Sequence, residues 1–135
     1  MSRIVRDTRV VDFVAERIGG RPEKCMAVGL ERDGVIVAGA LYEKCNGRNV
    51  FFHGAGDGTR RWATREFIRE LVRFPFVELD VPRMTAVAAA SNEAAIAFDL
   101  KLGFEEEGRL RAAAHDGSDS VYLTLWRHKC PWLAL

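Results

Sequence analysis

The chain has 135 residues, of which 48% are hydrophobic and 29% charged, and its formal net charge at pH 7 is +1. This size and composition fit one globular domain, residues 1–135, that can bury an ordinary core. A net charge this close to zero argues against nucleic acid as a partner, because a phosphate-binding surface is usually strongly basic. No apolar run reaches the length of a membrane span, so we expect no membrane association.

The N-terminus and the cysteines predict the compartment. Charged residues are scattered through the first seven positions without an apolar run, so no signal peptide is predicted. Cys25, Cys45 and Cys130 are odd in number and have no metal-ligand spacing. This favours free thiols in a reducing compartment and no metal site. We therefore predict a cytoplasmic protein.

The first half of the sequence predicts one helix and three strands. A helix that Asp7-Thr8 can cap runs to Ile18 with apolar residues at helical spacing, and Gly19-Gly20 stops it. The pattern then changes to short apolar runs, and the turn signals Asp33-Gly34 and Asn46-Gly47 separate them. The three strands expected there are Met26–Glu31, Val35–Tyr42 and Asn49–His53.

The second half predicts a strand between two helices, followed by a hairpin. Glycines 54, 56 and 58 end the third strand, and Pro75 and Pro82 bound a short connection after the first of these helices. The last two strands are expected to pair across Asp116-Gly117. The elements expected in this half are a helix at Trp62–Phe74, a small-residue strand at Met84–Ala90, a helix at Asn92–Leu102, and strands at Phe104–Ala113 and Ser120–Trp126.

The stretch from Ser91 to Phe104 is the most informative part of the chain. Ser91 or Asn92 can cap the start of a helix, and Gly103 supplies the left-handed residue after its end. Apolar residues three or four apart predict a buried stripe on this helix. The members of that stripe are Ala95, Ile96, Leu100 and Leu102.

The same stretch resembles a motif of the GCN5-related N-acetyltransferases, N-x-x-A-x(5)-K-x-G-F. Asn92, Ala95, Lys101, Gly103 and Phe104 match it. The predicted element order from residue 8 to residue 133 also resembles that superfamily. The resemblance implies an α+β fold: a single domain with a mixed, mostly antiparallel sheet flanked by helices.

The resemblance also implies acetyl-CoA as co-substrate, with its pyrophosphate at the start of the helix after the third strand. The family pattern there is Q/R-x-x-G-x-G/A. Placing Arg60 first puts Ala63 and Arg65 at the small positions, so the pattern is degraded. Consecutive amides at a helix start and three arginines can still bind phosphate. The alternative is a solvated basic helix start. The residues expected to bind the cofactor are Phe52, His53, Gly54, Arg60, Arg61, Trp62, Ala63, Thr64, Arg65 and Asn92.

Glu43 and His53 are the candidate catalytic residues, because the strands that carry them are expected to end near the thioester. A protonated amine must lose its proton before it can attack, and either side chain could accept it. The alternatives are a solvated Glu43 and a His53 that caps a turn. Where the family often has a tyrosine acid, this chain has Asp99. An exposed Asp99 is expected to be ionised and unable to donate a proton, so we predict that it is not the acid. The alternative is that burial raises its pKa and restores a donor.

The sequence therefore predicts an acyl-CoA-dependent N-acyltransferase. It would transfer an acetyl group to an unidentified amine by direct attack in a ternary complex. A monomer and a homodimer both stay open. Residues 61–67, 74–76 and 130–133 also resemble short acetyltransferase-like proteins of bacteriophages and prophages. The alternative hypothesis is a catalytically degenerate binding or virion-associated protein of the same fold. Acetyl-CoA binding distinguishes the two hypotheses.

Overall fold

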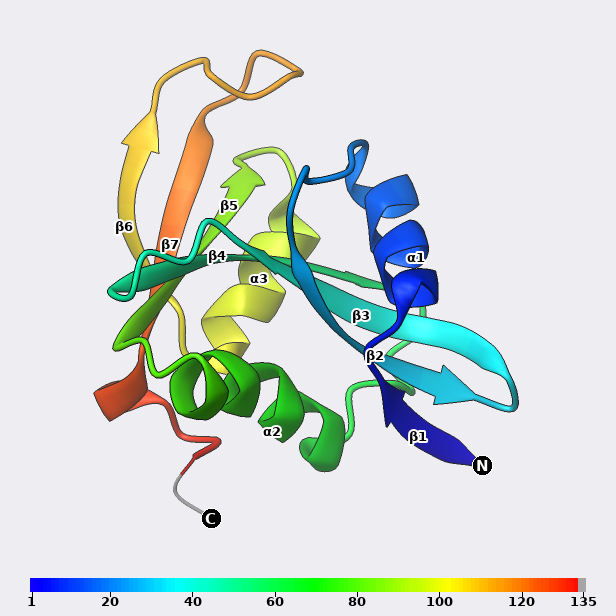
Figure 1. Cartoon of the computed structure of the whole chain (residues 1–135). Helices are drawn as coiled ribbons and strands as arrows, with labels where there is room; N and C mark the ends of the chain where they lie inside the picture. Colours follow the sequence, from blue (N-terminus) through cyan, green and yellow to red (C-terminus); the bar gives the residue numbers. More distant parts are fainter. Residues whose placement is uncertain (134–135) are drawn as a thin grey trace.

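The structure of the protein, a computed structural model, describes residues 1–133 (Figure 1). One seven-stranded sheet carries three α-helices. The strands are β1 (Ser2–Val5), β2 (Met26–Arg32), β3 (Val35–Glu43), β4 (Asn49–Gly56), β5 (Arg83–Ala89), β6 (Glu105–Leu110) and β7 (Ser120–Trp126). The helices are α1 (Thr8–Ile18), α2 (Arg65–Arg73) and α3 (Glu93–Leu102), with a π-helical turn, η1 (Phe74–Glu78), and a 3-10 turn, η2 (Arg127–Lys129).

The strands lie in the order β1-β2-β3-β4-β5-β7-β6. Every neighbouring pair is antiparallel except β4 and β5, which run parallel. Parallel neighbours need a crossover connection, and here α2 and η1 supply it. The sheet is therefore mixed and mostly antiparallel, as predicted.

Helices cover both faces of the sheet. On one face, Val10 and Val14 of α1 pack with Leu41 of β3. The next residue of β3, Tyr42, points to the opposite face because side chains alternate along a strand, and it joins the core under α2 and α3. Its hydroxyl donates a 2.6 Å hydrogen bond to the carbonyl of Leu71 in α2. Pro75 has no N–H to serve that carbonyl, so the tyrosine takes over the role of the missing helix donor.

The α1 face is closely packed because two strands present glycine to the helix. A Cβ atom on Gly29 would lie 2.5 Å from a methyl of Val10, and one on Gly39 would lie 2.6 Å from the other methyl. These distances are far below van der Waals contact. The glycines thus allow α1 to lie directly on the backbone of β2 and β3.

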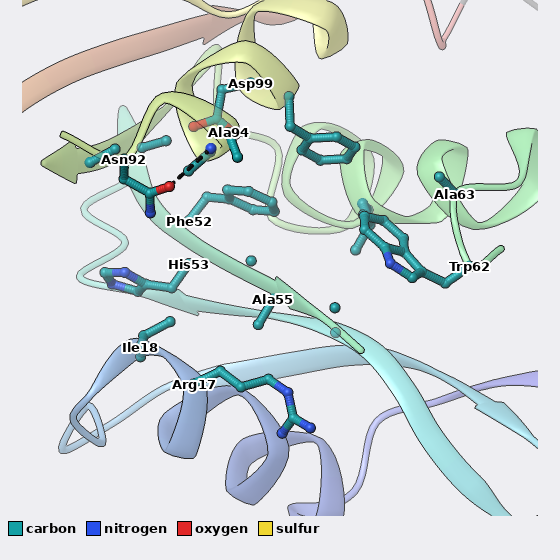
Figure 2. A pocket seen from close by; sticks show the side chains of 18 of the residues that line it. Arg17, Ile18, Phe52, His53, Ala55, Trp62, Ala63, Asn92, Ala94 and Asp99 are labelled. Atoms are coloured by element: carbon teal, nitrogen blue, oxygen red, sulfur yellow. Dashed lines mark hydrogen bonds between the residues drawn. The ribbon is translucent and has the colours of Figure 1, made fainter. Parts of the chain in front are cut away.

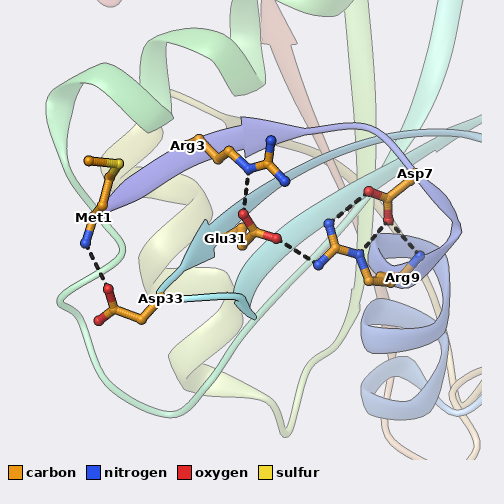
Figure 3. Close-up of polar contacts among 6 residues, drawn as sticks. All are labelled: Met1, Arg3, Asp7, Arg9, Glu31 and Asp33. Carbon is orange, nitrogen blue, oxygen red and sulfur yellow. Dashed lines mark hydrogen bonds and ion pairs between the residues drawn. The ribbon is translucent and has the colours of Figure 1, made fainter.

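An ion-pair network fastens the N-terminal segment to this face (Figure 3). Glu31 of β2 is 8% exposed and accepts from Arg3 of β1 at 2.5 Å and from Arg9 of α1 at 2.7 Å. Arg9 also binds Asp7, the N-cap of α1. The Arg3 and Arg9 guanidiniums lower the pKa of the Glu31 carboxyl. One carboxylate therefore joins β1, β2 and the start of α1.

The structure confirms most predicted elements and corrects several boundaries. Strand β1 was not predicted. The glycines after His53 do not end β4, which continues to Gly56, and α2 begins at Arg65 rather than Trp62. The predicted stripe of α3 is wrong at one position, since Leu100 is 51% exposed while Asp99 is buried.

Candidate active site

The sheet splits between its two parallel strands. β4 and β5 pair from Asn49 and Arg83 to Phe52 and Ala86, and their pairing stops there. Beyond this point β4 stays paired with β3 as far as Gly56, and β5 stays paired with β7 as far as Ala89. Each strand therefore has one unpaired backbone edge along the split. Such edges bind extended partners that offer amide groups.

The split opens into a cavity of about 1070 Å³ (Figure 2). Its lining includes Phe52 and Trp62, which pack on the α2–α3 side of the sheet. It also includes Arg17 and Ile18 at the end of α1, together with Ala55, which packs in the α1 cluster. The cavity therefore reaches both faces of the sheet, so that two molecules could approach the split from opposite sides.

Small residues and a fixed turn form the β5 side of the cavity. Ala86, Ala88 and Ala89 line it, and Asn92 follows as the N-cap of α3. The Asn92 side chain accepts from the Ala95 amide at 3.2 Å, the bond drawn in Figure 2. Both possible caps were considered from the sequence, and the structure selects Asn92. The side-chain oxygen of Asn92 is therefore hydrogen-bonded to α3, and the residue also borders the cavity.

The hairpin between β6 and β7 holds this turn in place. Ser91 and Ser118 both donate to Asp116, and the Ala90 amide donates to the Asp119 carbonyl at 2.8 Å. The hydrogen bonds from Ser118 and Ser91 lower the pKa of the Asp116 carboxyl to about 2. At neutral pH this carboxylate is ionised and keeps the hairpin attached to the start of α3.

Asp99 of α3 is the unexpected member of the lining. It is 8% exposed, and no hydrogen bond or ion pair to its carboxyl group is found among residues 1–133. Burial raises its pKa from the ordinary 3.8 to about 7. The expectation of an exposed, permanently ionised Asp99 is therefore wrong. Near neutral pH this group holds a proton for a large part of the time.

Glu43 and His53 meet on the α1 side of the sheet. Leu41 and His53 are cross-strand partners, and Glu43 is two residues from Leu41, so all three side chains share a face. The His53 Nε2 atom contacts a Glu43 carboxylate oxygen. His53 lines the cavity, whereas Glu43 reaches it only through His53. The two candidate residues are thus in contact, and the Glu43 carboxylate orients the ring of His53.

The loop between β4 and α2 uses several of its own amides. Asp57 accepts from the Thr59 amide at 2.9 Å, and the Thr59 hydroxyl accepts from the Arg61 amide at 3.3 Å. The Ala63 amide donates to the Arg60 carbonyl at 3.0 Å. A continuous run of free amides from 59 to 65, the basis of the predicted phosphate site, is therefore absent from this part of the structure.

Arginine side chains provide the positive charge at this end of the cavity. Arg60, Arg61 and Arg65 are exposed, and the contacts found among residues 1–133 include no ion pair for any of them. By contrast, Arg3 and Arg9 bind carboxylates. An anion at the loop would therefore meet guanidinium groups that are not already neutralised.

Most of the predicted cofactor-binding residues line the cavity: Phe52, His53, Gly54, Arg60, Trp62, Ala63 and Asn92. Arg61, Thr64 and Arg65 do not. Thr64 instead caps α2, accepting from the Phe67 amide at 3.2 Å. The sequence interpretation missed Arg17 and did not predict the burial of Asp99. Helical spacing could have indicated Asp99, which lies four residues after Ala95 and three before the buried Leu102.

Two further predictions concern metals and membranes. Among residues 1–133, no group of three or more His, Cys, Asp and Glu side chains could hold a metal ion. No helix in the described part of the chain is long and apolar enough to cross a membrane.

Comparison with known proteins supports the fold assignment. No family model and no curated protein matches the sequence. A mutant of the Vibrio cholerae spermidine N-acetyltransferase SpeG has a TM-score of 0.78 at 14% identity, over 98% of this chain and 96% of that one. The Campylobacter jejuni N-acetyltransferase PseH, in complex with acetyl coenzyme A, has a TM-score of 0.68 at 10% identity, over 94% and 99%. A probable acetyltransferase is 24% identical over 78% of this chain and 63% of its own, with a TM-score of 0.66. At these identities the similarity establishes the fold alone, and the predicted α+β fold with a mixed, mostly antiparallel sheet is confirmed as one that these proteins share.

Proposed function

We propose that the protein is an acyl-CoA-dependent N-acyltransferase that transfers an acetyl group from acetyl-CoA to an amine by direct attack in a ternary complex. The observation that carries this proposal is the split between β4 and β5. It gives a cavity with polar groups on both faces of the sheet and open strand edges between them. A thioester donor and an amine acceptor could therefore approach each other through the sheet.

The residues around the split fit acetyl-CoA. Its pantetheine arm carries amides and would lie along the unpaired edges of β4 and β5. There is little room for side chains here, since a Cβ atom on Gly54 would lie 3.0 Å from the Phe52 ring and one on Gly56 would lie 2.4 Å from Trp62. The pyrophosphate would lie by the loop before α2. With several loop amides used internally, Arg60 and its neighbours would provide most of the attraction.

Bound acetyl-CoA supplies an activated acetyl group, and this chain's own residues manage the protons. His53, oriented by Glu43, would accept the proton of the incoming amine on the α1 side. Asp99 lies on the cavity wall and can hold a proton for the departing sulfur. Along β4, alternate amides point away from β3, and those between His53 and Gly56 face the split. One of them would donate to the developing oxyanion.

Isothermal titration with acetyl-CoA, followed by an assay against a panel of amines, tests this proposal. We expect saturable binding, and free thiol should appear only when a suitable amine is present. Ligand at one hundred times its dissociation constant should add about 2.7 kcal/mol to the free energy of unfolding, which thermal shift would detect. The absence of both binding and thermal shift at millimolar acetyl-CoA would refute the proposal.

One observation favours a second candidate, a binding protein of this fold that lacks catalysis. Asp57 places a carboxylate in the loop where a phosphate would lie, and the Thr59 hydrogen bonds lower its pKa and keep it ionised. This charge opposes the arginines. Acetyl-CoA binding without turnover of any amine would favour this candidate. Membership of the bacteriophage-like group, a cytoplasmic location and a homodimer stay predictions.

A further inference from the structure

Trp62, a residue of the cavity lining, carries a hydrogen-bond donor that the fold does not explain. Its indole Nε1 is the one side-chain nitrogen or oxygen that is completely covered and has no hydrogen-bond partner in the part of the chain that the structure describes. Trp62 comes from the loop before α2 and reaches over the end of β4 (Figure 2). A Cβ atom on Gly56 would lie 2.4 Å from this nitrogen, so the indole rests directly on the strand backbone.

An unpaired buried donor is unusual in a native protein and carries a desolvation cost of about 1–3 kcal/mol. Two other polar aromatic side chains of this chain do have hydrogen-bond partners. The Tyr42 hydroxyl reaches the Leu71 carbonyl, and the Trp132 indole donates to the Leu102 carbonyl at 2.9 Å. Packing alone does not require the nitrogen at position 62, because a phenyl ring could occupy the same apolar surroundings. The N–H group therefore needs an explanation outside the folded chain itself.

The surroundings of the indole indicate the kind of acceptor. Phe67 lies edge-on to it at 6.2 Å between ring centroids, and Phe98 lies at 5.3 Å. Such apolar surroundings suit a neutral acceptor better than a charged one. The arginines that suit phosphate are exposed. The unpaired edge of β4 ends beside Trp62 at Gly56, where an extended arm with amide groups would pass.

We propose that Trp62 is a binding residue for the acyl donor and that its indole N–H donates a hydrogen bond to a neutral carbonyl of the donor's pantetheine arm. This inference rests on the function proposed above. It adds a side-chain contact that recognises the arm itself, in addition to the strand edges and the arginines. Binding the donor would satisfy a group that the free protein leaves unpaired, so part of the ligand's affinity comes from removing that penalty.

Trp62→Phe tests the proposal, because it keeps an aromatic ring and removes the N–H group. By isothermal titration, we expect the variant to bind CoA about tenfold more weakly than the wild type, as befits one lost hydrogen bond. The loss should be the same at 50 mM and 500 mM NaCl, since a neutral contact is not screened. The melting temperature without ligand should be unchanged or higher, because the unpaired donor is gone.

Trp126→Phe is the matched control. Trp126 lies on β7 against Arg83 and His128, away from the cavity lining. The Trp126→Phe variant should bind CoA with unchanged affinity, and CoA should still change the tryptophan fluorescence of that variant. In Trp62→Phe, CoA should no longer change the fluorescence. Gly56→Ala is a second variant, which displaces the indole with a methyl group and should also weaken CoA binding.

The outcomes separate this inference from the proposed function. If the wild type binds CoA and Trp62→Phe binds it equally well, the inference is wrong and the proposed function stands. A loss of affinity that shrinks at high salt would also overturn it, because it would indicate a phosphate contact. If Trp62→Phe does not fold, unchanged CoA affinity in Gly56→Ala overturns it. If the wild type does not bind CoA at all, both proposals fail together.

Discussion

The α1 face and the split between β4 and β5 treat polar groups in opposite ways. On the α1 face, Glu31 is buried but carries two arginine partners, and close packing is obtained by placing glycines under the helix. At the split, Asp99 is buried without a partner, and the Trp62 indole has no acceptor. Both regions belong to the same sheet, so the unpaired buried groups are a property of the split and not of the sheet as a whole.

The contrast shows that the residues around the split lower the stability of the folded protein. Unpaired buried groups raise the free energy of the folded protein, and here they occur together around one cavity. Satisfied groups hold the rest of the sheet together. Substitutions at the split should therefore alter binding or rate without destabilising the folded protein, whereas substitutions on the packed faces should lower its stability.

The largest expected effect is that of Asp99→Asn on turnover. If Asp99 supplies a proton, the maximal rate should fall about a hundredfold or more while acetyl-CoA affinity changes little. The wild-type rate should fall above pH 7, as a group with a pKa of about 7 loses its proton, and the variant should lack this decline. Steady-state kinetics across pH 5 to 9 would measure both. A rate within threefold of wild type would show that Asp99 is not the donor.

The same residue gives a pH effect on stability with a defined sign. Between pH 4 and 7 the unfolded carboxyl is ionised, while burial keeps the folded one protonated. The folded state therefore binds more protons, and stability falls as pH rises, by about 4 kcal/mol over that range. In Asp99→Asn this contribution disappears. Urea unfolding at pH 4.5 and 7.5 would show a smaller difference for the variant; equal differences would contradict the assignment.

On the packed side, Gly39→Ala should destabilise the protein by about 2 kcal/mol, because the new methyl meets Val10 at 2.6 Å and α1 must shift. Gly39 also borders the cavity, so a shifted α1 could disturb the acceptor side; CoA affinity should nevertheless stay within about twofold. Gly108→Ala, in strand β6 with nothing within 4 Å of the added Cβ atom, is the control for replacing a strand glycine by alanine without a clash. Chemical denaturation measures the stabilities. A large loss of CoA affinity with little loss of stability would contradict the assignment of Gly39 to the packed α1 face.

At the basic end of the split, Arg60→Glu should weaken CoA binding about tenfold at low salt and less at 500 mM NaCl, because exposed charges are screened. Arg48→Glu makes the same charge change in the turn before β4, outside the cavity lining, and should have little effect. Titration calorimetry at the two salt concentrations distinguishes them. Equal weakening by both variants would mean that only the overall charge matters.

The smallest effect is expected for Tyr42→Phe. This change leaves the Leu71 carbonyl without the donor that Pro75 cannot provide, and it should cost about 1 kcal/mol of stability. CoA affinity should not change, since Tyr42 lies in the core and outside the lining. Thermal unfolding and titration of the same preparation would check both. A change in affinity would show that this core contact reaches the site.

The sequence predicted those features that local patterns control. Asn92 and Gly103 mark both ends of α3, and both caps are confirmed. Strand β1 was missed because its four residues carry no pattern of their own, and pairing with β2 and the Arg3–Glu31 ion pair define it. At the site, hydrophobicity placed Leu100 inside and Asp99 outside, and the opposite is true. The cavity tolerates a carboxyl group there, which a rule based on polarity cannot anticipate.

The short seam of paired residues between β4 and β5 couples the two halves of the sheet. Four residue pairs, from Asn49–Arg83 to Phe52–Ala86, are the strand pairing that joins the β1–β4 half to the β5–β7–β6 half. β4 forms one wall of the cavity and β5 forms the other, and the two strands belong to different halves of the sheet. A change of twist at the seam would therefore change the distance between β4 and β5 at the cavity. Val50 and Met84 are a buried pair within the seam and do not line the cavity, so we expect a change of side-chain size there to alter the width of the cavity from a distance.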